Sequence, residues 1–181
     1  MTASRRIVVT GCWGAGKTYL ARKLKGDGEI PLLSLDHIVF ERVLADGSGE
    51  AKTKVILRKR EEVQRLLGEF LLGYQWILEG VYGKYLSPAL QTATLFVWID
   101  RPEEDCLAGL KERGIQMMKD HGRDLSEEQN ARMFERVRNY RERDDHLGFR
   151  FHRKLFDSFR GEKVRITSKK EADQWLASLL C

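Results

Sequence analysis

The segment from Gly11 to Thr18, Gly-Cys-Trp-Gly-Ala-Gly-Lys-Thr, carries the strongest chemical signal in this chain. It matches the pattern GxxxxGK(S/T) between a β-branched run and a helical pattern, which is the context the motif requires. Its glycines let successive amides point inward, and the following helix adds the positive end of its dipole. Lys17 supplies a charge for the β and γ phosphates, and the Thr18 hydroxyl can ligate Mg²⁺. The segment predicts ATP binding by the residues Gly11, Cys12, Trp13, Gly14, Ala15, Gly16, Lys17 and Thr18.

Two carboxylates follow apolar runs that are typical of strands. Asp36 closes the run over residues 31–35, and Glu79 follows residues 76–78. Because the carboxyl ends of parallel strands meet at the ligand crevice, we expect both side chains near the phosphates. Asp36 and Glu79 can then join Thr18 in the Mg²⁺ shell, and Asp36 can also orient or deprotonate an acceptor hydroxyl. The alternative for both is a structural acid in a turn or at a helix cap.

Two further residues beside helix starts are interpreted as structural. Asp100 follows the most apolar run, residues 94–99, and precedes Pro102 and three acids. Acids suit the positive end of a helix dipole, so we interpret Asp100 as a capping residue rather than a catalytic one. Cys12 lies where thiolates are favoured, and we interpret it as a filler position rather than a redox sensor.

The elements that must hold these residues alternate along the chain. Apolar periods near 3.6 predict helices, including one long amphipathic helix over residues 53–72. Ser168 and Glu171 form a capping box for the last helix. Strands separated by helices predict an α/β fold, with a parallel sheet covered on both faces, in a single domain over residues 1–181. The five predicted strands are residues 7–10, 31–35, 76–78, 94–99 and 164–167.

Residues 111–160 break this alternation, because they are dense in arginine and show no strand pattern. Interleaved acids favour exposed, ion-paired helices. Phosphotransfer to a second substrate, however, requires a mobile cover that carries cations and keeps water from the γ-phosphate. Residues 114–147 are the candidate for that cover, and we call them the lid.

A GTPase is the natural rival, and the sequence argues against it. The guanine-specific pattern NKxD is absent. A DxxG pattern occurs at residues 145–148, but it lies in the arginine-rich helical region rather than at a strand end, so we interpret it as accidental. The remaining readings are phosphotransfer to a small molecule and simple ATP hydrolysis.

The composition of the chain excludes some classes of protein. The 181 residues are 42% hydrophobic and 33% charged, with a net charge of +5, which suits an anionic ligand or weak nucleic-acid contact. This composition, without an apolar run near the ~20 residues of a membrane span, excludes a disordered chain and a membrane-spanning one. The N-terminus lacks a signal-peptide pattern, and Cys12, Cys106 and Cys181 are widely spaced. We therefore expect a cytoplasmic protein with reduced thiols and no membrane partner.

The chain resembles P-loop small-molecule kinases of the adenylate kinase and shikimate kinase type, and most of all the bacterial adenylate-kinase-like proteins called DNA topology modulation proteins. The resemblance spans nearly the whole chain. It is carried by GxxGxGKT, Leu35-Asp36, residues 76–82 (Trp-Ile-Leu-Glu-Gly-Val-Tyr) and residues 99–102 (Ile-Asp-Arg-Pro). It implies a P-loop NTPase fold with strand order 2-3-1-4-5 and an arginine-bearing helical lid.

The same resemblance assigns roles to individual residues. Arg136 corresponds to the lid arginine that contacts the transferring phosphates, and Arg113 to a second phosphate-contacting arginine. Gly109 stands where relatives place an arginine that stacks on adenine, and Glu79 stands where they usually have an aspartate. Lys84 replaces the arginine that grips a monophosphate in adenylate kinases, so a true adenylate kinase is not expected.

The sequence therefore predicts an ATP-dependent kinase that moves the γ-phosphoryl group to a small hydroxyl- or phosphate-bearing acceptor. In this hypothesis Lys17, Arg136 and Arg113 neutralise charge, and Asp36 faces the acceptor. Two alternatives remain. One is a nucleotide-dependent nucleic-acid-binding protein that uses the basic segment 132–160, and the other is an ATPase that lacks an acceptor.

Overall fold

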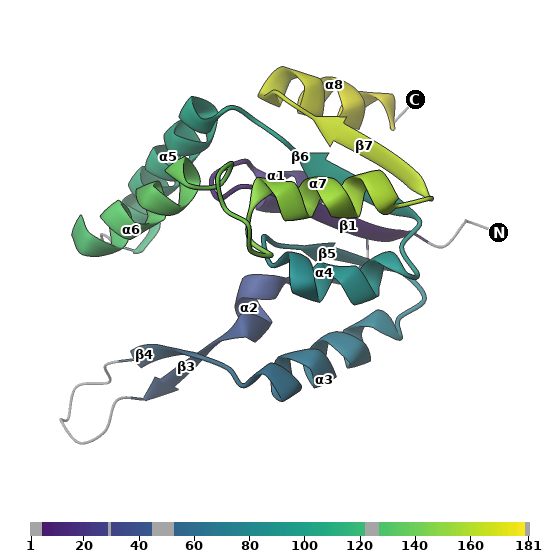
Figure 1. Ribbon diagram of the computed structural model, residues 1–181, viewed down its shortest axis with the longest axis horizontal. Coiled ribbons are helices and arrows are strands. Elements are labelled where there is room, and N and C mark those ends of the chain that lie inside the picture. Colours follow the sequence, from purple (N-terminus) through teal and green to yellow (C-terminus); the bar gives the residue numbers. More distant parts are fainter. Residues whose placement is uncertain (1–4, 29, 45–52, 122–126, 180–181) are drawn as a thin grey trace.

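The computed structural model describes residues 5–28, 30–44, 53–121 and 127–179 (Figure 1). Its strands are β1 (Arg6–Gly11), β2 (Leu32–Ser34), β3 (Phe40–Leu44), β4 (Thr53–Leu57), β5 (Trp76–Glu79), β6 (Leu95–Ile99) and β7 (Glu162–Ile166). Its helices are α1 (Lys17–Lys25), α2 (Leu35–Val39), α3 (Arg60–Leu71), α4 (Gly83–Leu90), α5 (Glu103–His121), α6 (Glu127–Arg138), α7 (Phe149–Ser158) and α8 (Lys169–Ser178).

A five-stranded sheet in the order β2-β5-β1-β6-β7 forms the centre of the protein. All neighbouring strands in it are parallel. Numbered within this sheet alone, the order is 2-3-1-4-5, so the predicted fold class and strand order are confirmed. The register pairs Val9 of β1 with Glu79 of β5, and Gly11 with Ile99 of β6. The carboxyl ends of these three strands therefore lie side by side at one edge of the sheet.

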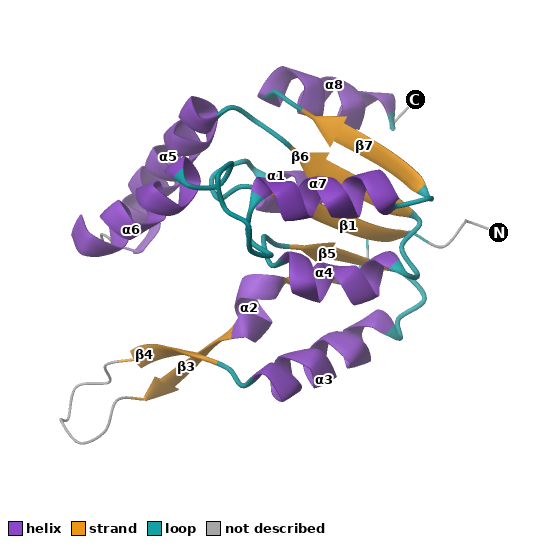
Figure 2. Ribbon diagram, viewed as in Figure 1, coloured by secondary structure: helices purple, strands orange, loops and turns teal. Residues whose placement is uncertain are grey.

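Both faces of the sheet are buried, as the apolar strands require. Ile7 and Val9 of β1 pack in one half of the core with residues of α1 and α8. Val8 points to the opposite half, where the helices α3, α4 and α7 cover the sheet (Figure 2). Each fully buried large apolar side chain contributes about 1.5–3 kcal/mol, so this two-sided core holds the strand ends in fixed positions.

The prediction of one helix over residues 53–72 is wrong. Residues Thr53–Leu57 form β4, which pairs antiparallel with β3, and the helix α3 begins at Arg60. The register places Leu57 opposite Phe40, and the Arg58 amide donates to the Val39 carbonyl over 2.9 Å. The β-branched residues of this segment favour a strand, although its apolar residues also fit a helical period. Pairing with β3 stabilises the strand over the helix. The ribbon β3–β4 extends away from the sheet in Figure 1.

The arginine-rich region is helical, as predicted. Helices α5 and α6 pack against each other, and α7 returns the chain to the sheet (Figure 1). The segment that we call the lid, residues 114–147, thus includes the end of α5, all of α6 and the loop before α7. Its motion stays a prediction. Among the helices that the structure describes, none combines the length and apolarity needed to cross a membrane.

Candidate nucleotide and acceptor site

The P-loop, residues 11–18, joins β1 to α1 in the predicted place. Gly16 caps the helix with φ 96°, and α1 begins at Lys17. The Lys17 ammonium donates to the Cys12 carbonyl over 2.8 Å, which holds it within the curl of the loop. The loop and this ammonium lie at the end of β1, beside the carboxyl ends of the neighbouring strands, and a loop in this position binds a phosphate chain.

Helix α5 packs directly against the P-loop through two glycines. Gly14 has φ 74°, and a Cβ on it would lie 2.0 Å from the Cys106 carbonyl oxygen. A Cβ on Gly109 would lie 2.2 Å from the Gly14 carbonyl oxygen. No larger side chain fits at either position without moving backbone. The structure therefore leaves no room at position 109 for the stacking arginine that the resemblance would lead one to expect.

Thr18 and Glu79 provide a pair of hard oxygen ligands beside the loop. The Thr18 hydroxyl donates to Oε1 of Glu79 over 3.1 Å. Glu79 ends β5 and is only 3% exposed, and within the described part of the chain no ion pair neutralises it. A buried carboxylate next to a hydroxyl and an anion-binding loop fits Mg²⁺, which takes one or two protein ligands and completes its shell with water and phosphate oxygens.

Among the described residues, no three His, Cys, Asp or Glu side chains are grouped so that they could hold a metal ion.

Asp36 lies in the first turn of α2 and is exposed. Its Oδ1 accepts a hydrogen bond from the Tyr82 hydroxyl over 3.1 Å. Burial raises the pKa of Tyr82, and the charge and the hydrogen bond of Asp36 raise it further. Tyr82 therefore stays a neutral donor to the carboxylate. Sequence reasoning gave Tyr82 no role, because its partner is 46 residues away in the chain.

Arg136 is the lid arginine that the structure brings to the site. It is exposed on α6, and its guanidinium lies 5.9 Å from the ring centroid of Trp13, in the P-loop. Its charge also lowers the pKa of Tyr82, against the larger effects of burial and Asp36. Arg136 is therefore near both the loop and the Tyr82–Asp36 pair.

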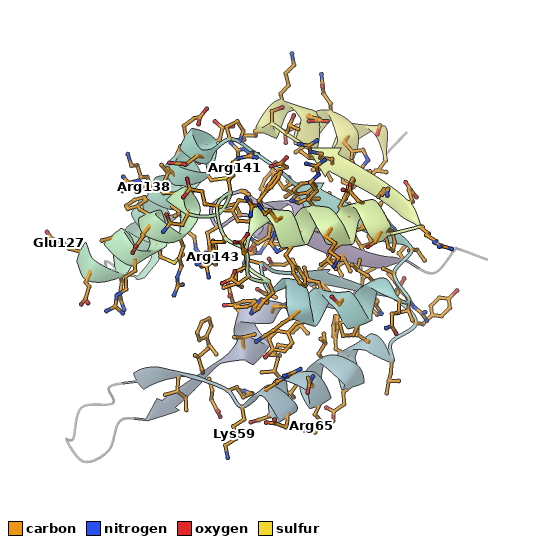
Figure 3. All side chains as sticks on the ribbon, viewed as in Figure 1. Lys59, Arg65, Glu127, Arg138, Arg141 and Arg143 are labelled. Atoms are coloured by element: carbon orange, nitrogen blue, oxygen red, sulfur yellow. The ribbon has the colours of Figure 1, made fainter. Side chains whose placement is uncertain are left out.

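The sequence also singled out two other cations, Arg113 and Lys84. Arg113 is exposed on α5, one turn beyond Gly109. Lys84 lies over the ring of Tyr85 at 4.8 Å. Figure 3 labels Arg141 and Arg143 in the loop after α6, and both are in ion pairs, with Asp100 and Asp145. Ion pairing thus accounts for part of the arginine-rich region.

The interpretation of Asp100 as a helix cap is wrong. Its carboxylate, 1% exposed, accepts from Arg141 Nη2 and from Arg165 Nε, each over 3.0 Å. Arg165 lies on β7, so Asp100 joins β6, β7 and the loop after the lid helix. A buried acid can remain charged when two guanidiniums satisfy it, and losing either partner would leave a costly buried charge.

Cys12 is buried, as is its neighbour Cys106. Interaction with Cys106, together with burial, raises the pKa of the Cys12 thiol. A raised pKa means little thiolate, so the interpretation of Cys12 as a filler position agrees with its surroundings.

Solved structures share this fold. No protein-family model matches the sequence, and no curated protein matches it significantly. TT1252 from Thermus thermophilus is 16% identical, with a TM-score of 0.50, over 99% of this chain and 97% of that one. Shikimate kinase from Acinetobacter baumannii in complex with shikimate is 15% identical, with a TM-score of 0.53, over 98% and 91%. The chain thus has the fold of P-loop small-molecule kinases.

Proposed function

We propose that this protein is an ATP-dependent kinase that transfers the γ-phosphoryl group to a small hydroxyl- or phosphate-bearing acceptor. The observation that carries the proposal is one grouping of side chains. Lys17 and Thr18 from α1, Glu79 from β5, Arg136 from α6 and Asp36 from α2 lie near the carboxyl ends of β1 and β5. A carboxylate at this edge can orient either an acceptor hydroxyl or a water molecule, so the assay below is designed to separate transfer from hydrolysis.

The roles of the residues follow from the charge that develops in phosphoryl transfer. Lys17 and the loop amides bind the β and γ phosphates, and Arg136 stabilises charge on the transferring oxygens. Thr18 and Glu79 would hold Mg²⁺ directly or through water, and the bound ion would supply positive charge beside the phosphates. Asp36 orients the acceptor hydroxyl and accepts its proton. We propose Arg113, which lies one turn beyond Gly109 on α5, as a second phosphate-contacting arginine.

The test is an ADP-release assay with Mg²⁺ and ATP over a panel of nucleosides, nucleoside monophosphates, sugars and shikimate-like acids. We expect at least one acceptor to raise ADP release well above the rate with water alone, and Lys17→Ala to abolish the increase. Equal turnover with every compound overturns the kinase proposal and leaves the ATPase reading.

A second candidate function, nucleic-acid binding, is favoured by a basic groove along α7. A cavity of about 660 Å³ is lined by Arg141, Phe149, Arg150, Arg153, Lys154, Asp157 and Ser158. Its cations suit backbone phosphates, although all three of its arginines already pair with carboxylates. This candidate is supported if a single-stranded oligonucleotide binds with an affinity that falls steeply with salt and changes with ATP. If Arg153→Ala and an α3 variant such as Arg65→Ala weaken this binding equally, the groove is not the binding site.

We also propose a cytoplasmic location. Cys12 and Cys106 are free thiols in the core, and free thiols persist in reducing compartments. Fractionation of cells that express the tagged protein tests the location directly.

A further inference from the structure

We propose that Tyr82 is the positioning residue of the acceptor side: its hydroxyl holds the Asp36 carboxylate in one orientation and leaves the second carboxylate oxygen for the acceptor. This inference rests on the proposed kinase function. It assigns no contact between Tyr82 and the reacting atoms. Tyr82 acts only through Asp36.

The chain brings these two residues together by a close approach of β5 and α2. A Cβ on Gly80, which follows β5, would lie 2.8 Å from the Cβ of Leu35, the residue before Asp36. Leu35 itself is fully buried, so it cannot yield. Only glycine allows this approach, and the approach places Tyr82 within hydrogen-bond distance of Asp36.

The backbone on both sides of Tyr82 is fixed by hydrogen bonds. The carbonyl of Val81 accepts from Nε2 of the buried His152 over 2.8 Å, and the amide of Gly83 donates to the His146 carbonyl over 2.8 Å. His152 is held in turn, because its Nδ1 accepts from the Tyr140 hydroxyl over 2.8 Å. The segment that carries Tyr82 is therefore anchored to α7 and to the loop before it.

The ring of Tyr82 is fixed as well. It makes an edge contact with Phe40 at 6.5 Å between centroids and a tilted contact with Tyr85 at 6.4 Å. A half-buried ring between two others has little freedom to rotate out, so its hydroxyl points in one direction. Asp36, in contrast, is exposed, and in the described parts of the chain only Tyr82 donates a side-chain hydrogen bond to it.

Because the Tyr82 ring is fixed and Asp36 is exposed, we assign the orientation of the Asp36 carboxylate to the Tyr82 hydroxyl. An exposed aspartate samples several rotamers, and a catalytic group must be held near one geometry to act efficiently. The phenol stays protonated because burial and Asp36 raise its pKa, while Arg136 opposes them and Tyr85 adds a small increase. Removing the hydroxyl frees the carboxylate without disturbing the P-loop.

The first experiment compares Tyr82→Phe with Tyr85→Phe, using the acceptor that the panel identifies. Tyr82→Phe keeps the ring contacts and removes only the hydroxyl, so we expect kcat to fall about tenfold or more while KM for ATP changes less than about twofold. Tyr85→Phe, which keeps its ring and has no bond to Asp36, is expected to match the wild type. An unchanged kcat in Tyr82→Phe overturns the proposal.

The second experiment needs no acceptor. The Cζ signals of ¹³C-labelled tyrosines are compared by NMR at neutral pH in the wild type and in Asp36→Asn, with Tyr82→Phe to assign the signal. We expect the Tyr82 signal to shift in Asp36→Asn, because its hydroxyl loses a carboxylate as hydrogen-bond acceptor. An unchanged Tyr82 signal overturns the Tyr82–Asp36 link.

The outcomes separate this inference from the function on which it rests. If no compound stimulates ADP release, the kinase proposal and the role of Tyr82 both fall. If an acceptor is found and Tyr82→Phe turns over like the wild type, the kinase proposal stands and only the role of Tyr82 falls.

Discussion

The hydroxyl of Thr18 donates to Oε1 of Glu79 over 3.1 Å, joining the first turn of the P-loop helix to the end of the adjacent strand. This hydrogen bond places the Thr18 hydroxyl and the buried Glu79 carboxylate side by side at the P-loop. The resemblance noted from the sequence leads one to expect an aspartate at this position, and here the glutamate side chain spans the distance to the Thr18 hydroxyl. The longer side chain reaches Thr18 from a strand end that is fixed by pairing with β1.

Removing the Thr18 hydroxyl or the charge of the Glu79 carboxylate is expected to weaken Mg²⁺ binding. For Thr18→Val and Glu79→Gln we predict that half-maximal ADP release requires more Mg²⁺ and that kcat falls about tenfold or more, because the ion loses a ligand or an orienting partner. Titration of Mg²⁺ at saturating ATP measures this effect. Thr92→Val, at an exposed residue after α4, is the control and should match the wild type. Equal Mg²⁺ dependence in all four proteins contradicts the assignment.

The contact between Gly109 and Gly14 makes a prediction about helix α5. Gly109→Ala forces a methyl group against the Gly14 carbonyl oxygen, so we expect ATP affinity to fall and the protein to lose about 1–3 kcal/mol of stability. Gly114→Ala is the matched control, because a Cβ there meets nothing within 4 Å and alanine favours a helix. The check is urea unfolding together with ATP titration. A neutral Gly109→Ala would mean that the helix does not touch the loop in solution.

Arg136 is expected to act on the developing charge more than on binding. Arg136→Ala should reduce kcat about 100-fold or more, with a much smaller loss of ATP affinity. Arg138→Ala changes another exposed arginine at the end of the same helix (Figure 3), and it should have little effect on kcat. The measurement is kcat with the identified acceptor beside ATP affinity by calorimetry. A loss of affinity alone contradicts the role.

Buried His152 predicts a loss of stability in mild acid. Burial lowers its pKa from 6.5 to about 4, so between these values the unfolded chain binds a proton that the folded chain does not. Stability from this group is therefore full above pH 6.5 and declines as the pH falls toward 4, by on the order of 3 kcal/mol in total.

Urea unfolding at about pH 7.5 and about pH 5 tests this dependence. His152→Gln keeps a polar side chain without a titrating ring, so its free energy of unfolding should fall less between the two pH values. A parallel fall in the wild type and in His152→Gln would show that other groups cause the acid sensitivity.

Local patterns predicted much of this molecule. The P-loop was recognisable because residues 11–18 lie consecutively in the chain, and the sheet because its strands are short runs of buried, β-branched residues. The capping box was predicted as well, and Ser168 does accept from the Glu171 amide. The P-loop and the capping box depend on residues that are close in the chain, and the strands are marked by local apolar runs although their pairing joins distant segments.

The errors and omissions all depend on contacts between distant segments. The strand over Thr53–Leu57 exists because β3 pairs with it, and a helical period fitted the same residues. Asp100 was misinterpreted because its partners Arg141 and Arg165 lie far along the chain. Tyr82 was missed for the same reason. The predicted catalytic residues themselves stay predictions until the variants are measured.

The most direct test of the central claim is calorimetric titration of Mg²⁺ and ATP into the wild type and into Lys17→Ala. If the P-loop encloses the triphosphate, the wild type binds ATP with one site per chain, and Lys17→Ala, folded by circular dichroism, binds it at least about tenfold more weakly. A wild type that takes up neither ATP nor GTP in the presence of magnesium, or a Lys17→Ala variant that binds as tightly, would contradict the account.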